Sequence, residues 1–78
     1  MKLTLKFFGR LTEITGSDQL AWQTDETLSL TELEKQLDQQ FPDWSAQTYR
    51  IAVNQHLVDT VTLNDGDEVA FLPPFAGG

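Results

Sequence analysis

The sequence predicts an α+β fold in which a mixed sheet of four or five strands wraps over one main helix. Three observations predict it. Residues 2–8 alternate between apolar and polar side chains, as in a half-buried strand. Residues 30–41 carry apolar side chains at helical spacing. Strand-like segments at 50–54 and 68–72 follow that helix. The length suits one domain, so we expect a single domain over 1–78.

The first third of the chain predicts a strand, a short helix and a second strand. In residues 2–8 one face of the strand is apolar, and Gly9 ends it. Residues 10–15 suit one or two helical turns, and Gly16 suits a left-handed position at their end. Residues 18–23 predict a weaker second strand. The side chains expected to point inward from these elements are Leu3, Leu5, Phe7, Leu11, Ile14, Leu20 and Trp22.

The main helix has the clearest signature in the sequence. Ser29 and Glu32 have the spacing of a capping box, in which each side chain bonds the other's backbone amide. Pro42 ends the helix, because the residue before a proline avoids helical backbone angles. At about 100° per residue, the apolar positions form one narrow stripe. The stripe consists of Leu30, Leu33, Leu37 and Phe41.

The remaining segments predict the rest of the sheet. Residues 50–54 predict a third strand, Leu57-Val58 a short edge fragment, and residues 68–72 the last strand. The segment Asn64-Asp65-Gly66-Asp67 has the composition of a turn. We expect the helical stripe to pack against the inward side chains of the first, third and last strands. Those of the later strands are Ile51, Val53, Val69 and Phe71.

Charge and composition exclude several functions. Twelve acidic residues against five basic ones give a net charge of −7, which disfavours nucleic acid and anionic membranes as partners. The same charge favours either a partner with a basic face or solubility alone. No apolar run is long enough to cross a bilayer, and the start lacks the layout of a signal peptide. We therefore expect a soluble cytosolic protein.

No internal active site or cofactor site is predicted. The chain has no cysteine and one histidine, His56, so a zinc site or a nucleophile–histidine pair is not expected. Neither Gly-rich phosphate-binding pattern is present, so we expect no ATP binding by this chain alone. The acidic residues near 64–68 lack the loop pattern of a calcium site and suit a solvated turn. We expect the chain to bind neither a metal nor a cofactor.

The alternation of the strands also predicts what lies outside the core. If the inward residues face the helix, then Ala70 and Leu72 face away from it, and Phe8 either faces away or lies at the frayed end of its strand. Since the first and last strands are expected to be parallel neighbours, the side chains of Phe8 and Leu72 should lie close together. Leu57 could join them. An exposed apolar patch in so acidic a chain indicates a contact surface, and the alternative is a minor second core under a loop.

The end of the chain offers the reactive group. We expect residues 73–78 to form a flexible tail with a reach of about 20 Å. Pro73 and Pro74 stiffen its base, and Phe75 supplies one apolar anchor before Ala76. Gly77 and Gly78 have no Cβ, so the groove of another protein can close around them. The terminal carboxylate would need activation as an acyl-adenylate by a partner, after which a sulfur donor could make it a thiocarboxylate.

Four segments resemble the small subunits of molybdopterin synthase, in the sulfur-carrier family named MoaD and ThiS. They are Phe7-Phe8-Gly9-Arg10-Leu11, Ala52-Val53-Asn54-Gln55, Leu63-Asn64-Asp65-Gly66-Asp67-Glu68-Val69-Ala70-Phe71 and Leu72-Pro73-Pro74-Phe75-Ala76-Gly77-Gly78. The resemblance covers essentially the whole chain. It implies a β-grasp, ubiquitin-like fold, in agreement with the order of elements.

The resemblance also implies a function and its partners. A ubiquitin-activating-type adenylyltransferase would use ATP to adenylate Gly78, and a sulfur donor protein would convert it to a thiocarboxylate. The tail, residues 73–77 with Gly78 at its end, would then enter the large catalytic subunit and deliver sulfur to cyclic pyranopterin monophosphate. Two such transfers complete the dithiolene of molybdopterin. The family complex is a heterotetramer whose catalytic residues are expected on the large subunit, so the small subunit is no enzyme on its own.

The family's docking contacts match Phe8, Leu57 and Leu72 here. Two departures are present: Leu72 stands where the family often has Phe, and the common basic residue near Thr12 is replaced by Arg10 nearby. The ion pairs with the partner therefore remain open. The alternative functions are a sulfur carrier for thiamine thiazole synthesis, a ubiquitin-like protein modifier, and an interaction module whose Gly-Gly end is incidental.

Overall fold

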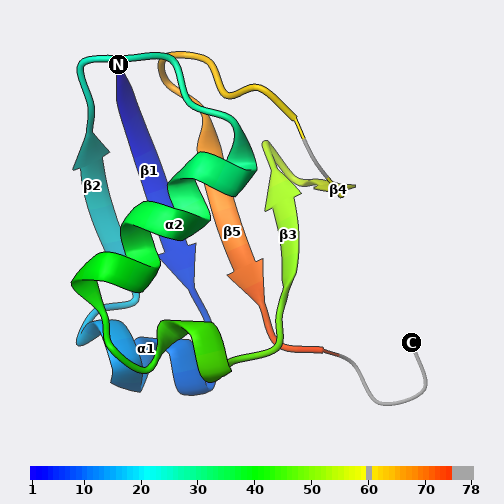
Figure 1. The fold of residues 1–78 in the computed structure, drawn as a ribbon. Helices are drawn as coiled ribbons and strands as arrows, with labels where there is room; N and C mark the ends of the chain where they lie inside the picture. Colours follow the sequence, from blue (N-terminus) through cyan, green and yellow to red (C-terminus); the bar gives the residue numbers. More distant parts are fainter. Residues whose placement is uncertain (60, 75–78) are drawn as a thin grey trace.

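The computed structural model describes residues 1–59 and 61–74, so Thr60 and residues 75–78 lie outside the described part. Figure 1 shows one sheet with a long helix lying across one of its faces. The described residues form eight elements in the following order. They are β1 (Lys2–Phe7), α1 (Arg10–Thr15), β2 (Gln19–Gln23), α2 (Leu30–Gln40), the 3-10 helix η1 (Trp44–Ala46), β3 (Arg50–Val53), β4 (His56–Val58) and β5 (Glu68–Leu72).

The five strands form a mixed sheet in the order β2-β1-β5-β3-β4. β1 and β5 are parallel neighbours at its centre, and the other three pairings are antiparallel. The helix α2 covers one face, and its side chains Leu30, Leu33 and Leu37 are buried there. The α+β prediction is confirmed, and a central parallel pair of first and last strands under one helix is the β-grasp arrangement.

Local signals in the sequence fix the helix ends. Ser29 and Glu32 form both hydrogen bonds of the predicted capping box, at 3.2 and 3.1 Å. Gly16 ends α1 in the left-handed conformation, at φ 77°. Phe41 differs from the expectation, because it is only partly buried and follows the helix with extended backbone. Pro42 explains the difference, since it excludes helical angles from the residue before it.

Three large core residues lie outside every predicted element. Leu28, Trp44 and Leu63 are buried, and the exposed fraction of Trp44 is 1%. The indole of Trp44 packs edge-on against the stacked rings of Phe7 and Phe71, with centroid distances of 5.8 and 5.0 Å. The segment around Trp44 is a 3-10 helix of three residues, too short to give a periodic pattern. None of the described helices has the length and apolar character needed to cross a membrane.

Candidate functional site

The face of the sheet away from α2 carries the residues predicted to contact a partner. Along β5, Val69 and Phe71 are buried on the helix side, so Ala70 and Leu72 point to the opposite face. Leu57 of β4 pairs with Ala52 of β3, which in turn pairs with Ala70. These pairs place the three side chains in one row across the outer face. Leu72 lies on the same face, two residues further along β5.

Phe8 and Leu57 are the large apolar side chains exposed on the described part of the chain, with exposed fractions of 44% and 53%. Phe7 pairs with Phe71 in the parallel register, so Phe8 and Leu72 follow directly on neighbouring strands. Leu72 is half-buried. The structure thus brings Phe8 and Leu72 to the same end of the outer face, whereas Leu57 lies on that face in the row of Ala70, on the edge strand β4. We call these three side chains the apolar face (Phe8, Leu57, Leu72). Since Phe8 and Leu57 are exposed, neither belongs to a second core, and their docking role stays a prediction.

The tail begins beside this face. Gly9 has φ +59°, and a Cβ placed on it would lie 3.7 Å from the Cβ of Pro73. The positive φ favours glycine here, whereas the distance to Pro73 would be an ordinary contact for a side chain. Pro73 and Pro74 are exposed. The remaining predicted tail residues, Phe75, Ala76, Gly77 and Gly78, lie outside the described residues.

A two-residue turn positions Leu57. Asn54 and Gln55 connect β3 to β4 with φ of 50° and 72°, the positive values of a tight hairpin turn. The Asn54 side chain fixes this turn against the start of β5. Its amide nitrogen donates to the Asp67 carboxylate at 2.9 Å, and its oxygen accepts from the Glu68 backbone at 3.0 Å. The exposed Leu57 is therefore presented by a braced hairpin rather than by a loose loop.

Two cationic side chains lie on the outer face near the apolar face. Lys6 and Arg50 both alternate onto the outer face, and Arg50 pairs with Leu72. The Lys6 ammonium lies 3.3 Å from the Glu68 carboxylate. Among the described residues Arg50 has no such ion pair. A partner on this face would thus meet the Arg50 guanidinium and the Lys6–Glu68 ion pair. The basic partner face expected from the net charge stays a prediction.

The acidic residues of the predicted turn serve the backbone. The Asp65 carboxylate accepts from the Lys2 amide at 2.6 Å, and the Asp67 carboxylate accepts from the Asn64 amide at 2.7 Å. Gly66 between them has φ 87°. Across the described residues, no group of three or more potential ligands could hold a metal ion. The structure supports the predicted turn, in which these carboxylates accept hydrogen bonds from backbone amides.

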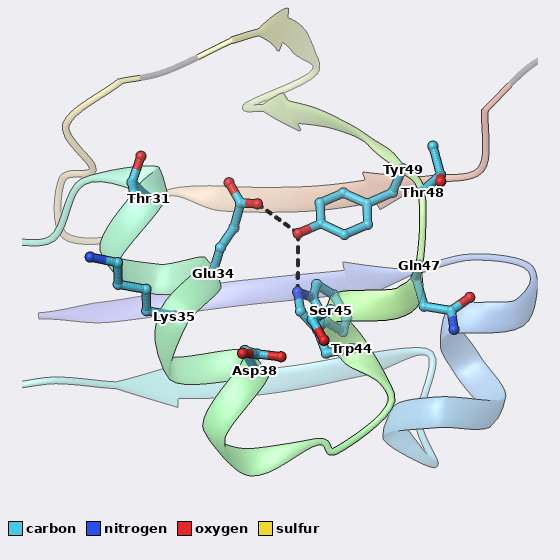
Figure 2. A pocket seen from close by; sticks show the side chains of 9 residues that line it. All are labelled: Thr31, Glu34, Lys35, Asp38, Trp44, Ser45, Gln47, Thr48 and Tyr49. Carbon is cyan, nitrogen blue, oxygen red and sulfur yellow. Dashed lines mark hydrogen bonds between the residues drawn. The ribbon is translucent and has the colours of Figure 1, made fainter.

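A separate groove of about 600 Å³ opens between α2 and the segment before β3 (Figure 2). A hydrogen-bond chain lines it, in which the Trp44 indole donates to the Tyr49 hydroxyl at 3.0 Å. That hydroxyl donates to the Glu34 carboxylate at 2.6 Å. Burial first, and then the bond to Glu34, raise the pKa of the Tyr49 phenol. These three side chains thus satisfy one another's hydrogen bonds and link α2 to the segment before β3.

The raised pKa of Tyr49 predicts a loss of stability at high pH. Above the ordinary tyrosine pKa of about 10, the unfolded chain ionises its phenol while the folded chain keeps the proton. The unfolded state then binds fewer protons, so the free energy of unfolding should be flat below that pH and fall above it. Urea titrations of the wild type and of Tyr49→Phe across this range test the effect. The substitution should flatten the fall, and an equal fall in both proteins would contradict the assignment to Tyr49.

Comparisons with known proteins cover almost the whole chain. The family model described as the ThiS family matches residues 5–78. The chain is 36% identical to the molybdopterin synthase sulfur carrier subunit of Mycobacterium tuberculosis, over 100% of this chain and 99% of that protein. It is 30% identical to the protein of the same description from Chlamydomonas reinhardtii, over the full length of both.

Solved structures give the same fold. A Pyrococcus furiosus protein described as a candidate subunit 1 of molybdopterin converting factor superposes with a TM-score of 0.88, at 23% identity over 96% of this chain and 99% of that one. Small archaeal modifier protein 1 of Haloferax volcanii gives 0.79 at 20% identity over both full lengths. A complex of subunits 1 and 2 of the Helicobacter pylori molybdopterin-converting factor gives 0.69 at 29% identity, again over both full lengths.

Proposed function

This chain belongs to the ThiS family, and we propose that within the family it is the sulfur-carrier small subunit of molybdopterin synthase. The observation that carries the proposal is the full-length match to two relatives described as sulfur carrier subunits of that enzyme. The Helicobacter pylori complex supports a second subunit as the partner. The small subunit would supply sulfur, and the large subunit would supply the catalytic residues.

The reacting group is the carboxylate of Gly78. A carboxylate oxygen attacks the α-phosphorus of ATP in the adenylyltransferase, pyrophosphate leaves, and an acyl-adenylate forms. Sulfide from the donor then attacks the carbonyl carbon, so a C–S bond forms and AMP leaves with the oxygen. In the large subunit the sulfur passes to cyclic pyranopterin monophosphate, and water at the carbonyl carbon restores the carboxylate. Two charged small subunits are needed for each dithiolene.

The apolar face is the docking surface for the large subunit in this proposal. Phe8 offers exposed apolar area beside the start of the tail, and Leu57 offers more on the edge strand β4. Lys6 and Arg50 lie on the same face of the sheet. Interfaces of this kind have an apolar centre with charges at the rim. The partner's surface should therefore be apolar here, with an acidic residue opposite Arg50. Docking there directs the tail, which begins at Pro73 next to Gly9, toward the bound subunit.

Charges placed on the apolar face should weaken docking without unfolding the domain. We expect Phe8→Glu and Leu72→Glu each to raise the dissociation constant for the large subunit by about thirtyfold or more, as for interface anchors. Calorimetric titration measures the affinity, and thermal melting of the free domain measures stability. Gln39→Glu, which adds the same charge on the exposed side of α2, is the matched control and should change neither. A large fall in melting temperature would show instead that these residues belong to the core.

Reconstitution tests the proposed function. The thiocarboxylated protein is mixed with the large subunit and cyclic pyranopterin monophosphate, and molybdopterin is measured. Product formation is expected in amounts set by the thiocarboxylate supplied, with two equivalents used for each product. If no molybdopterin forms, but the thiocarboxylated protein does supply sulfur to thiazole synthesis, the chain is instead a sulfur carrier of the thiamine pathway.

A second candidate is a ubiquitin-like protein modifier. The likeness to small archaeal modifier protein 1 supports the shared fold, at 20% identity. A modifier would form an amide between Gly78 and a lysine of another protein, whereas a sulfur carrier regenerates its free carboxylate. Isolation of the tagged chain from cells separates them, because conjugates of higher mass accumulate only for a modifier.

A further inference from the structure

The strand β2 forms one edge of the sheet, on the side opposite β4 (Figure 1). Its hydrogen bonds to β1 show which groups face outward. The Phe7 amide donates to the Asp18 carbonyl at 2.9 Å, and the Thr24 amide donates to the Met1 carbonyl at 3.0 Å. In an antiparallel pair every second residue makes these bonds. The backbone N–H and C=O groups that point to the open edge are therefore those of Gln19, Ala21 and Gln23.

This edge lacks the usual protection against pairing. Natural edge strands carry charged residues, prolines or bulges, which keep other strands away. The five residues of β2 read Gln-Leu-Ala-Trp-Gln and include neither a charge nor a proline. All three residues with outward backbone groups are exposed. Their register with β1 is continuous and carries no bulge. The edge is thus a regular row of donors and acceptors open to another strand.

We propose that β2 pairs antiparallel with β2 of a second copy of this chain, with Ala21 facing Ala21 on the two-fold axis. The sequence of the strand is nearly symmetric about Ala21, so this register places Gln19 opposite Gln23 and Leu20 opposite Trp22. In this register the residues with outward backbone groups lie opposite one another, Ala21 opposite Ala21 and Gln19 opposite Gln23. Each of these pairs can therefore exchange two backbone hydrogen bonds. The two five-stranded sheets become one sheet of ten strands.

The residues beyond the strand favour the same register. Counting outward from Ala21 places Asp18 opposite Thr24 of the second copy, and Asp25 opposite Ser17. No acidic residue meets another acidic residue across the axis, and each carboxylate faces a hydroxyl. This match of facing residues exists only between two copies of the same strand. A second copy of the chain is therefore a better partner for the edge than an unrelated peptide. The contact is short, so it belongs to the weak, reversible class of interfaces.

The pairing leaves the apolar face and the tail open. β2 is separated from β4 by the three other strands of the sheet, and β1 lies between β2 and β5, the strand that leads into residues 73–74. A dimer could therefore dock two large subunits at its outer ends. Because the two copies each carry a charge of −7, added salt should strengthen the pairing by screening their repulsion. An association held by salt bridges would weaken instead.

Charge substitutions at the axis test the proposal. Sedimentation velocity at increasing concentration should show the wild type moving from 8.8 kDa toward twice that mass, more readily at high salt. Ala21→Lys and Ala21→Glu each place like charges opposite one another and should weaken self-association by about tenfold or more. An equimolar mixture of the two variants places opposite charges on the axis and should restore pairing. Gln39→Lys on the exposed side of α2 is the control.

Each other outcome overturns the proposal. A wild type that stays monomeric at high salt up to its solubility limit excludes the dimer. A dimer that both variants leave intact lies on another surface. A mixture that fails to pair, although each variant alone is monomeric, excludes the register with Ala21 on the axis. Circular dichroism and melting of each variant as a monomer should match the wild type, because the Ala21 backbone groups make no bond within the sheet.

Discussion

Deletion of Gly78 is expected to abolish sulfur transfer and to leave the folded domain unchanged. In the proposed mechanism the carboxylate that attacks ATP, and later carries sulfur, belongs to that residue. Without it the carboxylate of Gly77 ends the chain about 3.5 Å short of its place. A displacement of even 1 Å at a reacting centre can cost about a hundredfold in rate. Addition of one alanine after Gly78 should be equally damaging, because it moves the carboxylate past the reacting position.

Intact mass spectrometry measures the effect directly. The wild type, incubated with the adenylyltransferase, ATP and sulfide, gains the mass difference between one sulfur and one oxygen, and both tail variants should gain none. One alanine added before Met1 is the matched control, with the same length but an unchanged tail. Urea unfolding should give the same midpoint for all four proteins. A chain without Gly78 that still acquires sulfur and forms molybdopterin would refute the tail mechanism.

Replacement of Trp44 by alanine should be the most destabilising change in the domain. The indole is buried among Phe7, Tyr49 and Phe71, with ring centroids between 5.0 and 5.8 Å away. Removal of a large buried aromatic costs about 3–5 kcal/mol, because lost contacts and a cavity add together. A domain of this size has a total stability of about 4–12 kcal/mol. The variant should therefore be partly or wholly unfolded near 37 °C.

Trp22 provides a matched control for this substitution. Each indole donates one hydrogen bond, from Trp44 to Tyr49 and from Trp22 to the Gln36 side chain at 2.9 Å. Trp22, however, lies on an edge strand and is only partly buried. Trp22→Ala should lower the free energy of unfolding clearly less than Trp44→Ala, as measured by urea titration at low protein concentration. Equal losses would mean that burial among the aromatic rings contributes little.

The order of elements and the helix-facing core could be predicted from the sequence because they follow from local periodicity. Alternation over 2–8 and 68–72 fixed which side chains point inward, and the structure buries those of both strands. The capping box at Ser29 marked the start of α2 to the residue. Strand ends were less certain, since β1 ends at Phe7 and β3 at Val53, each one residue earlier than expected.

The buried residues outside regular elements could not be predicted in the same way. Leu28, Trp44 and Leu63 are placed by tertiary contacts and belong to no repeating pattern. Phe41 shared the helical stripe but lost full burial, because Pro42 alters the backbone where the helix ends. Periodicity reports which face of an element is apolar, and it carries no information about irregular segments that fold back over the core.

Those parts of the candidate site that depend on the alternation of side chains along one strand could be predicted from the sequence. Those that depend on which strands pair with each other could not. The outward positions of Phe8 and Leu72 follow from counting along two strands. Leu57 reaches the same face through a hairpin whose turn, Asn54-Gln55, lacks the usual Asn-Gly signal. Likewise, the strand that Arg50 begins pairs with β5, and only this pairing shows that a cation lies beside Leu72. The net charge of the chain does not show on which face of the sheet each charged side chain lies.

The strand that leads into the tail lies at the centre of the sheet, bonded to β1 on one side and β3 on the other. Traction along the tail would load both rows of hydrogen bonds in shear, so that many must yield together. An edge strand pulled from its end could instead unzip one bond after another. The domain should therefore resist mechanical unfolding when a partner protein pulls on the tail.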